Sequence, residues 1–462
     1  MSASAGPPSG ESRLSRPGMG AQGCAVLSAW APRGGYRKTR TPRFEPGESS
    51  LGAKLRRASP GLGCSATAAR GENMRTAQPC MGAPARWLFI MGYNMKVLLV
   101  YSQVRTVHLE RIYNFNDDIK LIYNGTSYDF DEELANKLGA KRLSFFQTIF
   151  FLVKNRPAIA ELNEPSCIGI WLHLIPYIIV IKLTNSFLRE KTAIVAYAID
   201  NIDPTRVISK WLHLPHQIVE IPFRYIFTLI VKCYDRVAFG TQSSVEIYMR
   251  ATLGFPSQVE WKTFDALDKV CTFCQPIKKE RSIIFVGRFD ERKGLLQLMD
   301  AWQYVYARNN LARLYILGKG HLLDQVTLFS NSNKGVSVIV DPTRKEIHEY
   351  LNKARVLVLL SQPEKYWREQ VGLPILEGLS HGCEIIASEE TGISDWLRVN
   401  GHRVLPSYVS SIDLSKCIES ALINARNRAD IIHALPTEDT RMIAARWLWR
   451  PSMESDEVVH PS

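Results

Sequence analysis

Short apolar runs alternate with longer amphipathic stretches along most of the chain. From residue 95 onward the apolar runs have the length and residue types of strands, and the stretches between them have helical periodicity. Such alternation is typical of parallel sheets with helices covering both faces. The predicted strands are residues 96–101, 119–123, 192–199, 235–240, 282–287, 312–317, 336–340, 355–360 and 384–387.

The alternation falls into two series. Residues 255–280, rich in proline and charge, interrupt it after the fourth predicted strand. Two series joined by a linker predict an α/β protein with two doubly wound, Rossmann-like domains and an interdomain cleft. We expect the N-terminal domain at 95–275, the C-terminal domain at 276–435, and a tail without an assigned role at 436–462. Helices are predicted at 131–155, 168–188, 207–232, 243–253 and 410–427.

Residues 1–94 do not follow this pattern. They are a mixture of Gly, Pro, Ser, Ala and Arg without hydrophobic periodicity, which predicts a disordered basic leader. The leader holds 13 Lys and Arg against 4 Glu, and therefore most of the net charge of +12. Because the rest of the chain is nearly balanced, we expect no nucleic-acid partner. The leader is either an arginine-rich transit peptide or a non-native extension ahead of a natural start at Met95, and we favour the second interpretation.

One apolar run, residues 167–187, has the length of a membrane span. Pro176 and Lys182 interrupt it, and a predicted strand follows at once. A buried or partly interfacial helix fits better than a span. Together with the apolar residues 221–234, which include Arg and Lys, it leaves peripheral membrane contact open.

The nine cysteines are scattered, and Cys271 and Cys274 form the one CxxC of the chain. The sequence contains neither a second CxxC nor an HxxxH pair to complete a zinc site. We therefore interpret this CxxC as incidental and expect reduced thiols in a cytoplasmic protein.

A basic loop follows the predicted strand 282–287. It places Gly287, Arg288 and Lys293 at the carboxyl end of that strand, where open α/β sheets bind their ligands. A forked guanidinium and a mobile ammonium suit a diphosphate. The alternative is a solvated basic turn at a helix start. The spacing does not match a Walker loop.

A second loop, "EQVGLPILEGLSHG", leads into a helix. Pro374 is tolerated in a first helical turn, so Gly372 and Leu373 lie at a helix N-terminus suited to phosphate. Glu377 lies about one turn further on and points back toward this end, where it would reach a ribose. Glu369, in the loop ahead, would accept hydrogen bonds from a sugar. A glutamate early in a helix also stabilises the helix dipole without any ligand.

These motifs resemble the nucleotide-sugar-dependent retaining glycosyltransferases of the GT-B fold, family 4 (group 1). The likeness covers most of 282–405 and includes the segments "IIFVGRFDERKG", "LYILGKG", "IHEYLNKARVLVLLS", "EQVGLPILEGLSHGCEIIAS" and "TGISDWL". The resemblance implies that the diphosphate lies on the basic loop, the ribose on Glu377 and the donor sugar on Glu369. The donor-binding residues it implies are Gly287, Arg288, Lys293, Gly318, Gly372, Leu373 and Glu377.

The first series departs from the family pattern. Many relatives carry a His-Asp pair facing the cleft, where this chain has Ile199-Asp200-Asn201. We take Asp200, with Glu369, as the candidate catalytic residues; an Asx turn is the alternative role of Asp200. The glycine-rich first loop of many relatives is also missing, which leaves Arg105 and His108 as weaker candidates for acceptor or phosphate contacts.

The resemblance implies a hexosyltransferase that uses a nucleotide-diphosphate sugar and retains the anomeric configuration. No DxD follows a predicted strand, so we expect no metal and no cofactor besides the co-substrate. The expected acceptor is a glycan or lipid-linked glycan of polysaccharide biosynthesis, at a cytoplasmic or inner-membrane location. Two alternatives remain: a nucleotide-sugar epimerase of the same fold, and a catalytically silent scaffold in glycan assembly.

Overall fold

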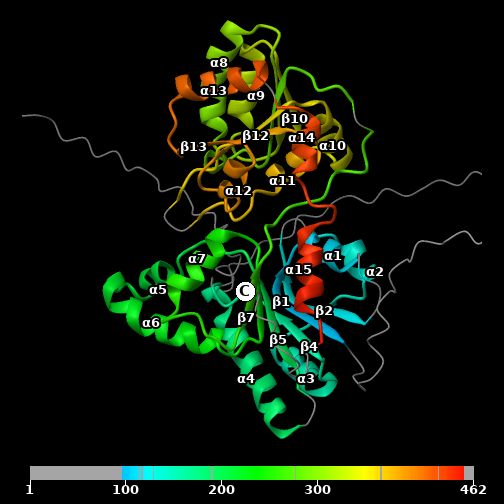
Figure 1. Ribbon diagram of the computed structural model, residues 1–462, viewed down its shortest axis with the longest axis vertical. Coiled ribbons are helices and arrows are strands. Elements are labelled where there is room, and N and C mark those ends of the chain that lie inside the picture. Colours follow the sequence, from blue (N-terminus) through cyan, green and yellow to red (C-terminus); the bar gives the residue numbers. More distant parts are fainter. Residues whose placement is uncertain are drawn as a thin grey trace, which may run out of the picture. The chain divides into compact units, whose positions relative to one another are not determined.

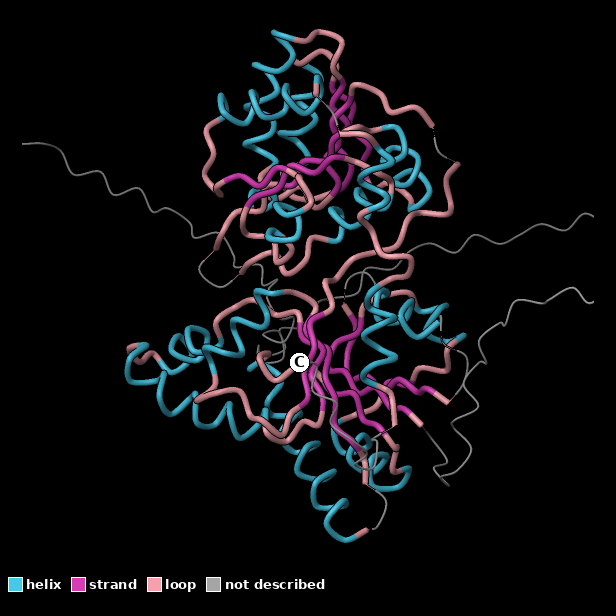
Figure 2. Tube along the Cα trace, in the orientation of Figure 1, coloured by secondary structure: helices cyan, strands magenta, loops and turns pink. Residues whose placement is uncertain are grey.

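The computed structural model contains two parallel β-sheets, each with helices on both faces (Figures 1 and 2). It describes residues 96–451 apart from 114, 116–117, 128–129, 189–190, 276, 365–366 and 425. The predictions for the leader, and for a start at Met95, lie outside the described residues. The two doubly wound sheets that the sequence predicts are confirmed.

The first sheet has seven strands in the order β3-β2-β1-β4-β5-β6-β7, and all neighbouring pairs are parallel. We call this sheet and helices α1–α7 the N-terminal lobe. The four strands predicted for this part of the chain are present. Its strands are β1 (Val97–Val104), β2 (Ile119–Thr126), β3 (Lys141–Arg142), β4 (Ile159–Leu162), β5 (Ala193–Ala198), β6 (Arg236–Phe239) and β7 (Glu260–Thr263).

The helices of the N-terminal lobe differ from the prediction in two segments. The single helix predicted at 207–232 is wrong, because His213 adopts a left-handed φ of 55° and separates two helices, Pro204–Leu212 and His216–Val231. The single helix predicted at 131–155 is wrong, because Gly139 adopts a left-handed φ of 64° and β3 follows it. Ser144 then starts a new helix with a capping box. The helices are α1 (Thr106–Tyr113), α2 (Glu132–Lys137), α3 (Phe145–Asn155), η1 (Ile168–Ile170), α4 (Trp171–Phe187), α5 (Pro204–Leu212), α6 (His216–Val231) and α7 (Gln242–Ala251).

The alternation of side chains along β1 explains why both faces are covered. Leu98 and Val100 pack into one hydrophobic cluster, whereas Val97 and Leu99 pack into another on the opposite face. A strand that buries both sets must have helices on each side.

Among the described helices, one stretch from Ile168 to Phe187 is long and apolar enough to cross a membrane by length and composition. One side of it is in the core, where Leu174, Tyr177 and Ile178 are buried. Its other side is exposed, with Leu172 and Phe187 among the most exposed apolar residues. The helix predicted at 168–188 is thus confirmed as partly buried.

The second sheet has six parallel strands in the order β10-β9-β8-β11-β12-β13. This repeats the strand order of the first sheet and is the doubly wound order. We call this sheet and its helices the C-terminal lobe. Its strands are β8 (Ser282–Val286), β9 (Arg313–Gly318), β10 (Val336–Val340), β11 (Val356–Leu359), β12 (Glu384–Ser388) and β13 (Arg403–Leu405).

The helices after β8 cover the second sheet, with one exception. The last of them, α15, packs against β5 and β6, where Ala444 and Leu448 join the hydrophobic cluster of the first sheet. The predicted tail 436–462 therefore contains a packed helix. These helices are η2 (Glu291–Lys293), α8 (Leu295–Arg308), α9 (Leu323–Ser332), α10 (Arg344–Lys353), α11 (Leu373–Ser380), α12 (Ser394–Val399), α13 (Ser411–Ile423), α14 (Arg428–His433) and α15 (Thr440–Leu448).

Candidate functional site

Two loops meet at the carboxyl ends of β8 and β11. These strands are neighbours in the second sheet, and the strand order reverses between them, since β9 continues on one side and β12 on the other. Doubly wound sheets bind ligands at this switch point. The loop 287–294 follows β8 and the loop 360–372 follows β11, so both predicted donor loops lie there.

Lys293 and Glu369 come together from these two loops. The Lys293 ammonium forms an ion pair with the Glu369 carboxylate, and the Ser361 hydroxyl donates to the same carboxylate oxygen at 2.9 Å. Gly294 makes this approach possible: it has a φ of 69°, and a Cβ there would lie 2.2 Å from the Leu360 carbonyl oxygen. The structure thus unites a predicted diphosphate contact with a predicted sugar contact.

Arg288 and Arg292 have different environments in the first loop. Arg292 donates twice to the Asp290 carboxylate, at 3.1 and 3.0 Å, and lies over the Trp367 ring at 4.8 Å. Arg288 lies 3.8 Å from the same carboxylate, and 46% of its side chain is exposed. The guanidinium available to a ligand is therefore the one that the sequence predicts.

The N-terminus of α11 lies beside the ion pair in the chain. Gly372 is the N-cap with a left-handed φ of 81°, and Pro374 occupies the first turn. The helix thus begins where the sequence predicts and ends before Gly382. The first amides of a helix have no intrahelical acceptor and carry partial positive charge, so they suit an anion. The contacts of Gly372 and Leu373 with a donor stay predictions.

Glu377 lies one turn inside α11 and is largely buried. Arg344 of α10 approaches its carboxylate at 3.2 Å. Burial raises the pKa of Glu377 to about 7, although the Arg344 charge opposes this shift. Sequence reasoning missed Arg344, because the two residues lie on different helices, 33 positions apart. Arg344 adds a cation beside the predicted ribose contact.

Gly287 and Gly318 lie at the ends of the neighbouring strands β8 and β9. A Cβ on Gly318 would lie 1.8 Å from the Gly287 carbonyl oxygen, so the two backbones approach too closely for a side chain. Gly320 has a similar constraint from the carbonyl oxygen of Phe289, at 2.3 Å. These glycines therefore have a packing role of their own, and their donor contacts remain predicted.

In the N-terminal lobe, Asp200 follows β5 and is buried. Its carboxylate accepts a hydrogen bond from the Ile202 amide at 3.2 Å, which is the Asx turn that the sequence offers as an alternative role. Burial raises the pKa of Asp200 to about 6. Asn201, next in the chain, donates its side-chain amide to the Glu369 carbonyl oxygen at 2.9 Å.

Glu164, which sequence reasoning missed, is a second buried carboxyl group next to Asp200. It accepts hydrogen bonds from the backbone amides of Ile199 and Asp200, both at 3.1 Å, and from the Ser166 hydroxyl at 3.0 Å. Burial, and then the Asp200 charge, raise its pKa. Two such groups titrate as a pair rather than separately. Glu164 fixes the backbone from which Asp200 projects.

The first loop of the N-terminal lobe holds Arg105 and His108. The Arg105 amide donates to His108 Nδ1 at 3.0 Å, and the imidazole packs against Tyr101 with 5.0 Å between ring centroids. Burial lowers the pKa of His108 to about 3, so the ring is neutral. These contacts give His108 a packing role at the start of α1.

A further group of polar side chains lies at the C-terminal end of α11. His348 and His381 approach Cys271 and Cys274, so that four possible metal ligands come together. The structure thus places two histidines beside a CxxC for which the sequence shows no further ligands. The two histidines come from different helix regions, and no sequence motif links them.

Residues 280–424 match the family model described as "Glycosyl transferases group 1". No curated protein matches the chain closely enough to count as a relative. Several solved structures share the fold of this chain. The lipopolysaccharide outer core galactosyltransferase WaaB, in its apo form, has a TM-score of 0.55 at 14% identity, over 77% of this chain and 99% of that one.

Two further structures agree. Anabaena HepE in complex with UDP has a TM-score of 0.55 at 12% identity, over 77% of this chain and 96% of that one. A glycosyltransferase from Rickettsia africae has a TM-score of 0.52 at 11% identity, over 77% and 98%. At these identities the likeness concerns the fold. The chain therefore has the GT-B fold, and the match to the group 1 glycosyltransferase model is confined to residues 280–424.

Proposed function

We propose that the chain transfers a hexose from a UDP-sugar to a glycan or lipid-linked glycan, with retention at the anomeric carbon. The observation that carries the proposal is the ion pair between Lys293 and Glu369 at the switch point of the second sheet. It joins a phosphate-binding cation to a sugar-binding carboxylate beside the start of α11. HepE, which has this fold, has been solved with UDP and with UDP-glucose, and this supports the choice of donor.

Each contact has a place in the proposed chemistry. The diphosphate lies between Lys293, Arg288 and the first amides of α11, where positive charge offsets the charge that develops on the leaving group. Glu377 and Arg344 lie one turn further along and face the ribose. Glu369 accepts hydrogen bonds from the sugar hydroxyls. These groups supply the electrostatic stabilisation without a metal ion at the diphosphate.

In the transfer step, the anomeric carbon loses its bond to the diphosphate oxygen and gains one to the acceptor oxygen. We propose that the acceptor proton passes to an oxygen of the departing diphosphate, so that the new glycosidic bond forms on the face of the sugar from which the diphosphate leaves. Asp200 would orient the acceptor or the donor sugar from the N-terminal lobe. Its backbone is held by Glu164.

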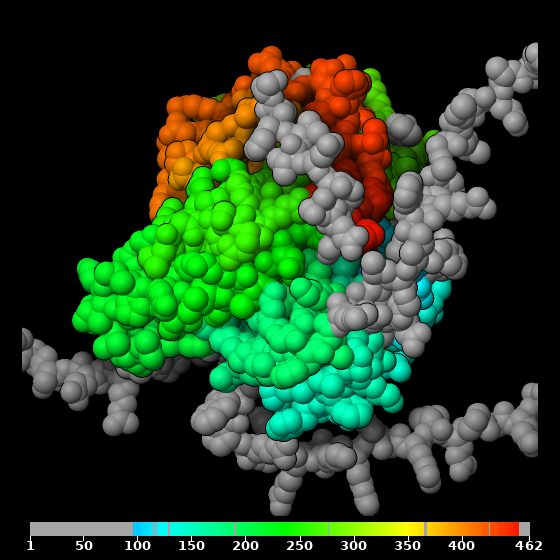
Figure 3. Space-filling model, turned by 60° about the horizontal axis from the view of Figure 1, so that its bottom comes forward, coloured from blue at the N-terminus to red at the C-terminus, as the bar shows by residue number. Residues whose placement is uncertain are grey.

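The proposed acceptor is membrane-proximal. Helices α3, α4 and α6 expose a group of large apolar side chains, and the regions containing these helices form one continuous face in Figure 3. Trp171 of α4 stacks on Phe223 of α6 at 5.5 Å, so the two helices are in contact. We propose that this face touches the cytoplasmic side of a membrane. The most exposed members are Phe146, Phe150, Leu172, Phe187, Ile218 and Ile221.

A donor panel tests the proposal. The full-length chain is incubated with UDP-, GDP- and ADP-sugars and with lipid-extracted acceptors, and the products are identified by mass spectrometry. We expect transfer from a UDP-hexose with the anomeric configuration retained. Epimerised donor without transfer would favour the epimerase alternative, and binding without turnover would favour a scaffold. Transfer that survives Glu369→Ala combined with Arg288→Ala would contradict the site assignment.

A further inference from the structure

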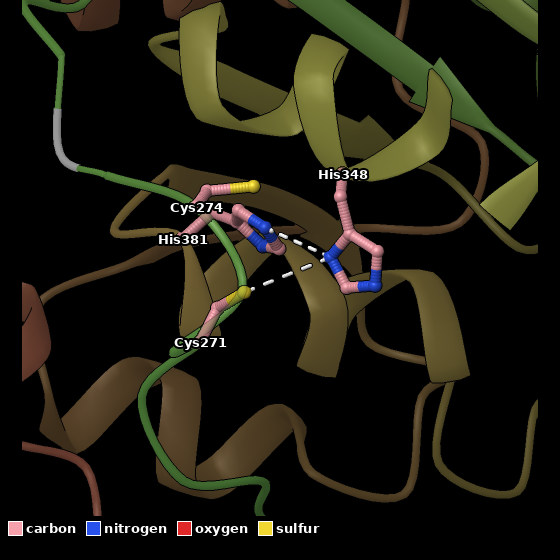
Figure 4. A group of neighbouring side chains, drawn as sticks. All are labelled: Cys271, Cys274, His348 and His381. Atoms are coloured by element: carbon pink, nitrogen blue, oxygen red, sulfur yellow. Dashed lines mark hydrogen bonds between the residues drawn. The ribbon is translucent and has the colours of Figure 1, made fainter. Parts of the chain in front are cut away.

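Four side chains that commonly bind metals gather at the C-terminal end of α11. Cys271 and Cys274 come from the segment between β7 and β8, His348 from α10, and His381 is the C-cap of α11. Their ligand atoms all lie within 4.8 Å of one another. Figure 4 shows the four side chains pointing toward a common centre.

Two distances within this group are close to the edges of a tetrahedron. Cys271 Sγ lies 3.7 Å from His348 Nδ1, and His348 Nδ1 lies 3.1 Å from His381 Nε2. A tetrahedral zinc ion, with about 2.3 Å to sulfur and about 2.0 Å to nitrogen, sets these edges near about 3.5 and about 3.3 Å. These three ligand atoms therefore already lie near the spacing that one zinc ion requires, and Cys274 Sγ lies within 4.8 Å of each of them.

The protonation of His381 follows from its other hydrogen bond. His381 Nδ1 lies 2.7 Å from the Glu377 carbonyl oxygen, which can only accept, so Nδ1 carries the proton. The lone pair is then on Nε2, the atom that faces His348 and the cysteines. Histidine ligands of metals commonly donate their second ring nitrogen to a carbonyl in this way, which fixes both tautomer and orientation.

Further contacts hold the ligands in place. The Cys271 amide donates to the Ser380 carbonyl oxygen at 2.9 Å, which binds the linker to the end of α11. With both thiols deprotonated, two cysteines balance the charge of one divalent ion. His381 is buried and the other three ligands are half-buried. A site whose ligand charges balance those of the ion can be buried to this degree.

We propose that Cys271, Cys274, His348 and His381 together bind one zinc ion. Two sulfurs and two nitrogens in tetrahedral arrangement select zinc among the common divalent metals. All four positions are filled by protein, which makes the site structural rather than catalytic.

The ion would cross-link three segments next to the donor site. It joins the linker to α10, which carries Arg344, and to α11, which carries Glu377. These two side chains contact each other at 3.2 Å. His348 and His381 lie one turn after Arg344 and Glu377, respectively, so zinc would fix the geometry of this neighbouring pair, independently of which sugar is transferred.

Metal content is the direct test. The full-length chain is purified in reductant without chelator or added metal, and its zinc is measured by mass spectrometry. We expect about one zinc ion per chain. Cys271→Ser combined with Cys274→Ser lowers the zinc content per chain at least tenfold. The matched control replaces two half-buried cysteines elsewhere, Cys233→Ser and Cys417→Ser, and keeps the metal.

Cobalt substitution keeps the test decisive if the double variant does not fold. Wild-type protein loaded with cobalt shows the visible bands of a tetrahedral thiolate site. His348→Cys retains these bands with a stronger sulfur-to-metal transition, whereas His348→Ala weakens binding at least tenfold. Wild-type protein that neither contains zinc nor binds added zinc or cobalt overturns the proposal. Equal zinc in the Cys271/Cys274 variant and its control, or a disulfide between Cys271 and Cys274 in reductant, does the same.

Discussion

The Lys293 ammonium and the Glu369 carboxylate form an ion pair across the ends of two neighbouring strands. Both side chains are mostly buried, and Ser361 holds the carboxylate from a third direction. Glu369 thus positions the lysine when no donor is bound. A bound diphosphate would also contact the Lys293 ammonium. The second oxygen of the Glu369 carboxylate could then accept a hydrogen bond from a sugar hydroxyl.

Lys293→Ala should lower the affinity for UDP by a factor of about 10 to 100, because a charge-assisted hydrogen bond contributes about 1.5 to 3 kcal/mol. Glu369→Gln should lower turnover with a smaller effect on UDP affinity, since UDP lacks the sugar that Glu369 is proposed to contact. Titration calorimetry with UDP and turnover with the donor sugar separate the two effects. Equal loss of UDP affinity in both variants would contradict the separate roles.

Arg288→Ala should weaken UDP binding about tenfold or more and leave the melting temperature unchanged. The reason is that its ion pair with Asp290, at 3.8 Å and half-exposed, contributes little to stability. The matched control is Arg308→Ala on α8, with a similarly exposed side chain paired to Glu419. UDP affinity that falls equally in both variants would show a non-specific charge effect.

Pattern and topology together predict most of the fold and part of the site. Nine strands were predicted and are present, because each forms an apolar run, which in most of them is buried in the core of a sheet. Four strands, β3, β4, β7 and β13, were not predicted, because they lack a long apolar run. The strand β7 is an exposed edge and β13 has three residues, so pairing with a neighbour rather than apolar pattern places them. Glu161 interrupts the short apolar run of β4.

The donor loops were predictable for a different reason. Lys293 and Glu369 each follow a strand, and the carboxyl ends of neighbouring parallel strands meet at one edge of the sheet. Arg344 and His348 are on α10, which forms no part of that edge. Their approach to α11 depends on how two helices pack, and local sequence does not encode that packing.

Glu377→Gln should make the protein more stable at pH 8 and leave its stability nearly unchanged near pH 4. Burial raises the pKa of Glu377 from 4.5 to about 7 in the folded state. Below pH 4.5 both states are protonated. As the pH rises to 7 the unfolded state ionises first, so folding loses stability, on the order of 3 kcal/mol. Thermal unfolding across this pH range measures the difference.

Two measurements complete the test of Glu377. Glu419→Gln gives the baseline for replacing an arginine-paired glutamate of similar exposure. A Glu377→Gln gain that is constant across pH would contradict the shifted pKa. Separately, wild type should bind UDP more tightly than 2′-deoxy-UDP, and Glu377→Ala should lose this preference if the carboxylate contacts the ribose.

Asp200→Asn should reduce transfer about 100-fold while UDP affinity stays within twofold of wild type. Asp200 belongs to the N-terminal lobe, away from the proposed UDP contacts. Burial raises its pKa to about 6, so above that pH the ionised carboxylate disfavours folding, and the uncharged amide of Asp200→Asn does not destabilise the protein in this way. Glu164→Ala differs, since it leaves the Ile199 and Asp200 amides and the Ser166 hydroxyl without their acceptor. It should lower both stability and turnover. Unchanged transfer in folded Asp200→Asn would contradict a catalytic role, and the Asx turn would then be the one role of Asp200.

A buried ion pair gives the N-terminal lobe a stability test that is independent of the donor site. Arg111 donates to Glu161 at 2.6 and 3.1 Å, and neither side chain is appreciably exposed. Tyr101 and Trp449 also donate to this carboxylate, at 2.6 and 2.5 Å. Because Trp449 directly follows α15, the network also holds the C-terminal segment against β4.

Arg111→Ala should destabilise the protein by about 3 to 5 kcal/mol, because it leaves a buried carboxylate without its counter-charge. Arg111→Met with Glu161→Leu should recover part of this loss, since two apolar groups need no charge partner. The recovery stays incomplete because the Tyr101 hydroxyl and the Trp449 indole lose their acceptor. Denaturant unfolding followed by tryptophan fluorescence measures all three proteins. A double variant less stable than Arg111→Ala would mean that the buried pair, and not only its balance of charge, holds the lobe together.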